Sequence, residues 1–288
     1  MSLQHRQGVK NVVEKAWFPK QHANPIIDDT TLTQNLATFL SDSRDRVKVP
    51  DLFRCSKIGH PDTYGEVTPE LVTSMMQQHE RLVGRASEST STFVDLGSGI
   101  GGVVCFIAGF RRFKACFGVE YERNRASYAD PLVKDFLGEL RSRSMRYSDI
   151  HIRFGDFLKC QTTLKYLQRA SLVWVNNVAF ASINFQLLTI LDKHVPLGCV
   201  VLSFVSFLPR LDVKNDSGFE KITEYTLPEA TDWTGTPQKV HVMQKKRWRE
   251  RSLSLGLHNR NTSFLLNYTI IRGVWHVMSD ALQMVCDE

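Results

Sequence analysis

The segment Phe93-Val94-Asp95-Leu96-Gly97-Ser98-Gly99-Ile100-Gly101 decides the expected fold of this 288-residue chain. An apolar run leads into a turn with glycine at every second position, and a further apolar stretch at 101–110 follows. Glycine lets a ligand approach the backbone, and the start of a helix supplies free N–H groups. The segment therefore predicts a strand, a ligand-binding turn and a helix, as in nucleotide-binding α/β proteins.

The details of the turn separate three classes of ligand. A P-loop requires Gly-Lys-Ser/Thr after its spacer, which is missing here, and a dinucleotide turn has the wider spacing G-x-G-x-x-G. Asp95 suits a cationic amino-acid group, because its carboxylate can accept hydrogen bonds from an ammonium. S-adenosylmethionine carries such a group and NAD does not, so we expect adenosylmethionine. A structural bend in an ordinary α/β protein is the alternative.

Regularly spaced apolar runs on both sides of the turn indicate alternating strands and helices around a parallel sheet. Five buried strands are expected, starting at Thr92, Cys116, Ile150, Ser171 and Cys199. The crossover helices are expected at 101–110, at 130–144, with Asp130 as N-cap and Pro131 at the first helical position, and at 183–194. Residues 219–227 and 238–245 read as an antiparallel pair. The sequence thus predicts a Rossmann-like α/β methyltransferase fold, a mostly parallel sheet with a C-terminal antiparallel hairpin.

Polar residues close the second, third and fourth expected strands, at the sheet edge where open α/β proteins bind ligands. Glu120 follows the turn by about 20 residues, where nucleoside-binding sheets place a carboxylate on ribose hydroxyls. Asp156 suits the adenine amino group, with a backbone N–H on a ring nitrogen. The alternatives are a solvated strand-end acid at Glu120 and a turn-forming Asp156.

The fourth strand ends in Asn176-Asn177-Val178-Ala179-Phe180. Adenine and cytosine amino-methylases place Asp or Asn, two prolines and an aromatic residue at this edge, so the Asn pair suggests methylation of an amine. The prolines are absent here. An Asn-rich turn without catalytic function is the alternative.

Composition limits the class of protein. With 42% hydrophobic residues the chain can bury a full core, and its six scattered cysteines without a CxxC pair indicate a reducing, intracellular compartment. No stretch approaches the roughly 18 apolar residues that span a bilayer, so we expect a soluble protein without membrane contact. No cluster of His, Cys and carboxylates suggests a metal. The formal net charge of +6 favours a polyanionic partner.

Three regions are expected along the chain. Residues 1–61 form a short N-terminal appendage with a possible helix at 32–40, residues 62–250 form the methyltransferase domain, and residues 251–288 form an extension of unknown role. A basic run closes the domain and is expected to bind a polyanionic partner; a solvated strand end is the alternative. Its members are Lys245, Lys246, Arg247, Arg249 and Arg251.

Several motifs together resemble the disruptor-of-telomeric-silencing family, the non-SET histone H3 lysine methyltransferases. Order and approximate spacing agree between about Asp62 and Lys246. The Asn-Asn-x-Ala-Phe and Trp-Thr-Gly pieces are the most specific. The matching motifs are Tyr64-Gly65-Glu66, DLGSGIG at 95–101, Val119-Glu120, Gly155-Asp156-Phe157, Val175-Asn176-Asn177-x-Ala-Phe180 and Trp233-Thr234-Gly235.

This resemblance implies S-adenosylmethionine as cofactor and a lysine in the globular core of nucleosomal histone H3 as methyl acceptor. It also implies a nuclear protein. The basic run is then expected to contact the nucleosome through DNA phosphate or an acidic histone surface. We expect a monomer. Asn176 and Tyr64 would be the catalytic residues. The cofactor residues would be Tyr64, Glu66, Asp95, Gly97, Gly99, Glu120, Asp156, Phe157 and Asn176, and the substrate lysine channel would consist of Trp174, Phe180 and Trp233.

The chain departs from the family pattern at three places. Val67 stands where the family has Thr after Tyr-Gly-Glu, and Gly102 stands where it has Gln after the glycine turn. Val240-His241 stands near the position of a family Tyr. Two other functions stay open. The basic composition and the Asn pair favour a nucleic-acid amine methyltransferase, against which the missing prolines count. The departures favour a cofactor-binding chromatin module that has lost catalysis.

Overall fold

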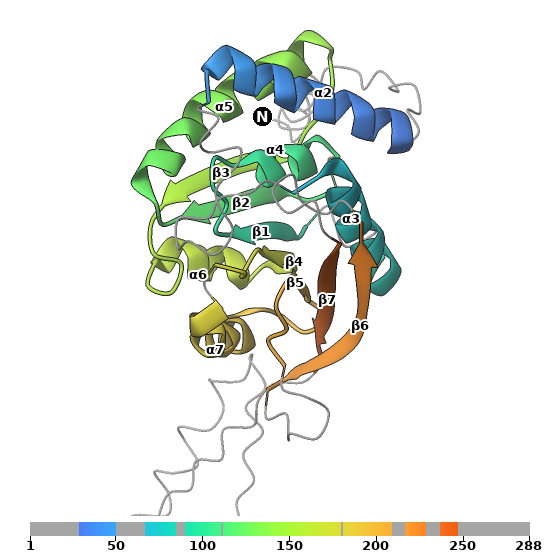
Figure 1. The fold of residues 1–288 in the computed structure, drawn as a ribbon, viewed down its shortest axis with the longest axis vertical. Helices are drawn as coiled ribbons and strands as arrows, with labels where there is room; N and C mark the ends of the chain where they lie inside the picture. Colours follow the sequence, from blue (N-terminus) through green and yellow to red (C-terminus); the bar gives the residue numbers. More distant parts are fainter. Residues whose placement is uncertain are drawn as a thin grey trace, which may run out of the picture.

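The computed structural model describes residues 29–49, 67–84, 90–110, 112–179, 181–208, 217–228 and 237–246. These residues form one seven-stranded sheet with helices on both faces (Figure 1). No helix within these ranges is long and apolar enough to cross a membrane.

The sheet has the strand order β3-β2-β1-β4-β5-β7-β6. Strands β1 to β5 pair in parallel, and β7 pairs antiparallel with both β5 and β6. This arrangement confirms the predicted mostly parallel sheet with a C-terminal antiparallel hairpin. The strands are β1 (Thr92–Leu96), β2 (Ala115–Glu120), β3 (Asp149–Phe154), β4 (Ala170–Val175), β5 (Val200–Ser203), β6 (Phe219–Leu227) and β7 (Gln238–Lys245).

Two hydrophobic cores lie on opposite faces of the sheet, because successive side chains of a strand point to opposite sides. On β1, Phe93 enters the core under α2 to α5, whereas Val94 and Leu96 enter the core under α6 and α7. Figure 1 shows these two groups of helices above and below the sheet. The helices are α2 (Asp29–Val47), α3 (Pro69–Val83), α4 (Gly102–Gly109), α5 (Arg123–Ser142), α6 (Gln161–Leu167) and α7 (Asn184–His194).

Strand β3 differs from the prediction of five buried strands. It is the edge of the sheet and pairs only with β2 among the described strands, so four of its six residues, including Arg153 and Phe154, are exposed. The alternation of polar and apolar residues at 150–154 (IHIRF) is typical of a strand with one face exposed to solvent. Strand β5 is also shorter than the apolar run 199–207 suggested.

Helix α5 begins seven residues before the predicted N-cap Asp130, so that prediction was wrong. The actual N-cap is Glu122, whose carboxylate accepts hydrogen bonds from the N–H groups of Asn124 (3.0 Å) and Arg125 (2.7 Å). This cap starts the helix early, and Pro131 lies inside it instead of at its first position.

Helices α2 and α3 place the first described residues in the same core as the sheet. Helix α2 continues well past the predicted 32–40, and its Leu36, Phe39 and Leu40 are buried against α4 and α5. Helix α3 was not predicted, although Thr68 as N-cap and Pro69 at the first position are its sequence signals. The domain boundary at 61/62 stays a prediction, but α2, which precedes it, packs on the sheet domain.

Candidate active site

The glycine turn between β1 and α4 has a backbone that only glycine adopts readily. Gly97 has φ 90° and Gly99 has φ 57°, both in the left-handed region. Glycine at these positions is therefore required by the turn itself, before any ligand is considered.

The N–H groups of this turn are used within the protein. Gly97 and Ser98 donate to the Val119 carbonyl (2.9 and 3.0 Å), and Gly101 donates to the Ser98 carbonyl (2.8 Å). Gly99 donates to Oε2 of Glu120 (2.8 Å). These four N–H groups are thus not available to a ligand, and the turn is unlike a phosphate cradle. The expected free N–H groups at the start of the helix concern α4 from Gly102 onward and stay a prediction. Ligand recognition falls to the neighbouring side chains.

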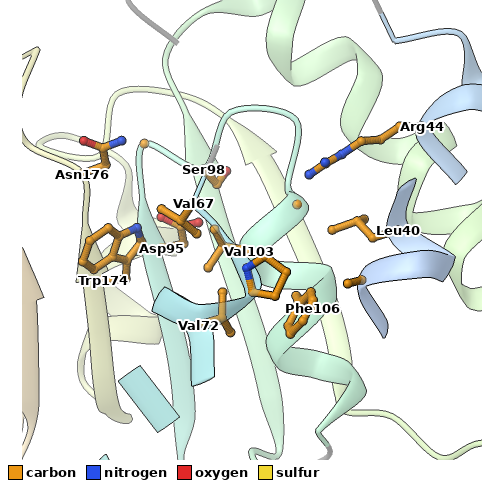
Figure 2. Close-up of a pocket in the computed structure, with 14 residues that line it drawn as sticks. Leu40, Arg44, Val67, Val72, Asp95, Ser98, Val103, Phe106, Trp174 and Asn176 are labelled. Carbon is orange, nitrogen blue, oxygen red and sulfur yellow. The ribbon is translucent and has the colours of Figure 1, made fainter. Parts of the chain in front are cut away.

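A pocket lies at the carboxyl end of β1 and β4, between the glycine turn and the helices α2, α3 and α4 (Figure 2). It encloses about 590 Å³ of empty space, part of it open to solvent. Its wall is mostly apolar. The lining residues are Ala37, Leu40, Arg44, Val67, Pro69, Val72, Asp95, Gly97, Ser98, Gly102, Val103, Phe106, Trp174 and Asn176.

Asp95 is a buried carboxylate in the pocket wall that has no counter-ion. It is 2% exposed, and no described residue donates a hydrogen bond to it or forms an ion pair with it. Burial raises the pKa of the Asp95 carboxyl well above its usual range, and the nearby Glu120 carboxylate raises it further. Ser98 adds a buried hydroxyl without a hydrogen-bond partner among the described residues. Unsatisfied polar groups of this kind fit a ligand with an ammonium group.

Glu120 lies behind the turn and does not line this pocket. Its Oε1 accepts hydrogen bonds from the N–H of Glu122 (2.8 Å) and from Nη2 of Arg125 (2.9 Å), while Oε2 holds Gly99. The carboxylate is 4% exposed. In the structure Glu120 stabilises the glycine turn through its hydrogen bond with Gly99. Its predicted contact with ribose stays a prediction.

Replacing Glu120 by alanine is expected to lower the affinity for S-adenosylmethionine by about 1–3 kcal/mol, because the turn loses its brace and the ribose its predicted acceptor. Titration calorimetry measures this loss. Arg125→Met is the matched control, since it removes one partner of Glu120 and leaves the carboxylate on Gly99; its loss should be smaller. An unchanged affinity in the Glu120 variant would contradict the predicted role.

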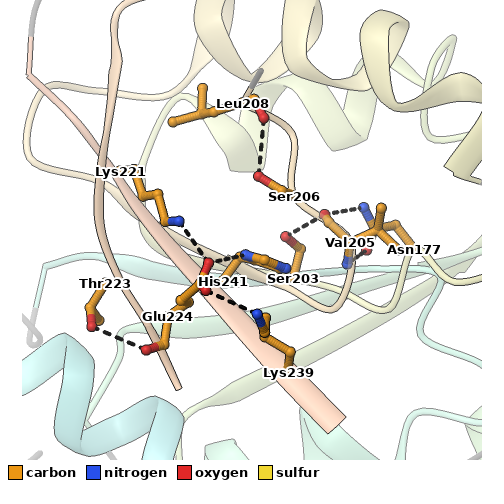
Figure 3. Close-up of polar contacts among 10 residues, drawn as sticks. All are labelled: Asn177, Ser203, Val205, Ser206, Leu208, Lys221, Thr223, Glu224, Lys239 and His241. Atoms are coloured by element: carbon orange, nitrogen blue, oxygen red, sulfur yellow. Dashed lines mark hydrogen bonds and ion pairs between the residues drawn. The ribbon is translucent and has the colours of Figure 1, made fainter. Parts of the chain in front are cut away.

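The two asparagines at the end of β4 have different surroundings. Asn177 is fully buried, and its amide donates to Oδ1 of Asn184 and to the Val205 carbonyl and accepts from the Val205 N–H, all at 2.8 Å. Figure 3 shows its bonds to Val205. Asn176 instead lines the pocket, half-buried. Asn177 therefore ties β4 to β5 and α7, and Asn176 is the residue of the pair that can meet a ligand.

Trp174 lies next to Asp95 in the β1–β4 register and also lines the pocket. It is 1% exposed and meets Phe204 edge-on, with ring centroids 5.0 Å apart. The structure thus makes it a core residue with one face toward the pocket, and its place in a lysine channel stays a prediction. Phe180 and Trp233, and Tyr64 and Glu66 of the expected loop, lie outside the described residues.

Asp156 and Phe157 follow β3 and do not line the pocket. The Asp156 carboxylate accepts a hydrogen bond from the Leu158 N–H (2.9 Å) and pairs with Lys159 (3.1 Å), as in a turn-forming aspartate. Phe157 is buried in the core on the α6–α7 face. The predicted contact of Asp156 with adenine and the predicted contact of Phe157 with the cofactor stay predictions.

The prediction that Lys245 contacts a nucleosome is wrong. Lys245 has no exposed surface, because its Nζ donates to the Asp192 carbonyl (2.7 Å) and pairs with the Asp192 carboxylate. Phe219 covers it, with the ring centroid 5.1 Å from Nζ. Lys246 is exposed, and Arg247, Arg249 and Arg251 lie outside the described residues.

Sequence reasoning missed the contribution of α2 and α3 to the pocket. Ala37, Leu40 and Arg44 come from α2, and Pro69 and Val72 come from α3. The capping signal at Thr68 and Pro69 marked α3, but no local pattern indicated which face of α2 would meet the glycine turn. Among the described residues no group of His, Cys, Asp and Glu could hold a metal ion.

The sheet order, the glycine turn and the pocket at the carboxyl ends of β1 and β4 define a Rossmann-like protein of the methyltransferase fold class. Residues 45–239 match the family described as "Histone methylation protein DOT1". The chain belongs to this family.

Relatives with the name "Histone-lysine N-methyltransferase, H3 lysine-79 specific" occur in fungi and animals. The protein of Chaetomium globosum is 32% identical over 74% of this chain and 42% of its own length. That of Drosophila melanogaster is 32% identical over 64% of this chain and 10% of its own. The chain thus spans less than half the length of these relatives, so their activity is a proposal for this chain.

A solved RNA methyltransferase from Salinibacter ruber, in complex with S-adenosyl-L-homocysteine, aligns with 63% of this chain and 94% of its own. Its TM-score is 0.42 and its sequence identity 18%. A similarity of this size adds nothing on function.

Proposed function

We propose that this chain transfers methyl groups from S-adenosylmethionine to the side-chain amine of a lysine in the globular core of histone H3 in nucleosomes. The names of the relatives point to lysine 79 of H3. The observation that carries the proposal is Asp95, a buried carboxylate without a counter-ion that faces a pocket at the carboxyl end of the central strands. Family membership supplies the class of reaction.

The residues of the chain fit this cofactor at its amino-acid end. Asp95 would accept hydrogen bonds from the ammonium group, and the turn at Gly97 and Gly99 would lie along the methionine part. When bound, S-adenosylmethionine supplies an electrophilic methyl group on a sulfonium. Further contacts, on ribose, adenine and the covering loop, are proposed for Glu120, Asp156, Phe157, Tyr64 and Glu66.

The pocket wall supports attack by a neutral amine. Trp174, Val67 and Val103 are apolar, and an apolar wall disfavours the ammonium form of a lysine by desolvation. We propose that Asn176 orients the amine and that the amine loses its proton to water, because Asp95, the carboxylate that lines the described part of the pocket, is assigned to the ammonium of the cofactor. Tyr64, Phe180 and Trp233 would complete the channel.

The proposed partner is the nucleosome, and the proposed site of action is the nucleus. After the exclusion of Lys245, the basic run that would contact DNA phosphate or an acidic histone surface consists of Lys246, Arg247, Arg249 and Arg251. The predicted monomeric state belongs to the same proposal.

Incubation of the full chain with labelled S-adenosylmethionine and either nucleosomes, free DNA or RNA tests the proposal. Label in histone H3 is the expected result. Label in nucleic acid would favour the amine methyltransferase of nucleic acids, and binding of the cofactor without transfer would favour a module that has lost catalysis. Either outcome overturns the proposed function.

Replacing Asp95 by asparagine is expected to lower the affinity for S-adenosylmethionine about 10- to 100-fold, because a charge-assisted hydrogen bond contributes about 1.5–3 kcal/mol. Titration calorimetry checks the affinity. The same variant should be more stable than the wild type at neutral pH without ligand. The raised pKa means that the stability contribution of Asp95 is full below its unfolded pKa and is lost as the pH rises through the folded pKa.

Thermal unfolding as a function of pH separates the two effects of this substitution. The stability difference should vanish at low pH, where Asp95 is protonated in both states. A variant that binds the cofactor as tightly as the wild type would remove Asp95 from the site.

A further inference from the structure

We infer that Arg44 of α2 binds the α-carboxylate of the amino-acid part of the cofactor, with Asp95 binding the ammonium. This inference rests on the proposed function. It adds to the site a residue of the segment 1–61, which the sequence predicted to lie outside the methyltransferase domain. It assigns to residues 29–49 a direct part in ligand recognition.

The charges of the pocket carry the first step. Of the described residues that line it, two carry a formal charge, and the charges are opposite: Asp95 at the end of β1 and Arg44 on α2. The α-carbon of a free amino acid carries a cation and an anion side by side. A pocket with one carboxylate and one guanidinium therefore matches both groups, whereas Asp95 alone matches only the cation.

The position of Arg44 is fixed by the packing of its helix. Leu36 and Leu40 precede Arg44 at helical intervals of four and are buried in the core, so the three lie on one face. Figure 2 shows the Arg44 side chain reaching from α2 toward the pocket, on the side opposite Asp95. On the neighbouring face, Arg46 points away from the pocket and forms a partly exposed ion pair with Asp135 of α5 (2.8 Å), so the buried leucines and not this pair set the orientation of the helix.

The rest of the described wall offers a carboxylate only neutral donors, among them the Ser98 hydroxyl and the Asn176 amide. The N–H groups of Gly97, Ser98, Gly99 and Gly101 already donate to acceptors in the turn or on β2. Gly102 has no side chain, and Val67 is apolar. A planar guanidinium can bind both oxygens of a carboxylate at once, which makes Arg44 the best-suited partner in this wall.

Ligands that differ only in the carboxylate test the inference. Decarboxylated S-adenosylmethionine keeps the sulfonium and the ammonium but lacks the carboxylate. By calorimetry on the full chain, Arg44→Met should lower the affinity for S-adenosylmethionine about 10- to 100-fold and that for the decarboxylated ligand less than about 3-fold. Asp95→Asn should lower both affinities, because both ligands carry the ammonium. Arg44→Lys should recover part of the loss.

Arg46→Met is the matched control, since it removes an arginine of the same helix that does not line the pocket. It should change neither affinity by more than about 3-fold. A loss in Arg46→Met that is as selective for the carboxylate as that in Arg44→Met would assign the effect to the position of α2 and overturn the inference.

The two proposals fail in different ways. If Arg44→Met binds both ligands as the wild type does, or if its affinities for both fall equally, Arg44 does not bind the carboxylate. The proposed function then stands. If the wild-type chain binds neither ligand, the proposed function itself fails.

Discussion

Replacement of Asn176 by alanine is expected to lower the rate of methyl transfer to nucleosomes about 100-fold, with only a small loss of affinity for S-adenosylmethionine. Asn176 is the polar residue at the end of β4 that faces the pocket, where the acceptor amine is proposed to meet the cofactor. A misplacement of reacting groups by about 1 Å is enough for a loss of about this size. Single-turnover kinetics and calorimetry separate the two quantities.

Asn177→Ala is the matched control for this prediction. The neighbouring amide makes three hydrogen bonds inside the protein, so its loss should lower the free energy of unfolding by about 1–3 kcal/mol. The folded fraction should still bind the cofactor. Equal losses of rate and affinity in Asn176→Ala would make Asn176 a cofactor ligand instead of a residue that orients the acceptor.

Replacement of Lys245 by methionine is expected to lower the free energy of unfolding by about 3–5 kcal/mol. The change leaves the Asp192 carboxylate buried, with the Gly218 N–H (2.8 Å) as its remaining described hydrogen-bond donor. Removal of one partner of a buried ion pair typically costs this much. Denaturant titration measures the loss.

Two further variants show whether the loss of stability in Lys245→Met comes from the broken ion pair or from the change in side-chain volume. The double variant Lys245→Met/Asp192→Asn keeps an acceptor for Gly218 and removes the unpaired charge, so it should recover most of the stability. Lys246→Ala, at the exposed neighbouring position, should change stability by less than about 0.5 kcal/mol. A neutral Lys245→Met would contradict the structural role that replaces its predicted contact with the nucleosome.

The sequence by itself determined the order of the strands and of helices α4, α5 and α7 from β1 onward, and the position of the ligand-binding turn, but it did not predict α6. Local patterns were sufficient for this. Glycine at 97 and 99 reflects left-handed backbone at both positions, and the apolar runs of β1, β2 and β4 reflect burial on both faces of a parallel sheet. The family motifs are local as well, and the match over residues 45–239 confirms the membership they predicted.

Tertiary structure alone decided which side chains meet at the pocket. Nothing in the neighbouring residues distinguishes Asn176 from Asn177, or the buried Lys245 from the exposed Lys246, because the difference lies in contacts with Val205 and Asp192, far along the chain. The same holds for Arg44, which reaches the pocket only because α2 packs across α4 and α5. Burial and partners depend on segments brought together by the fold, so they cannot be read from a local pattern.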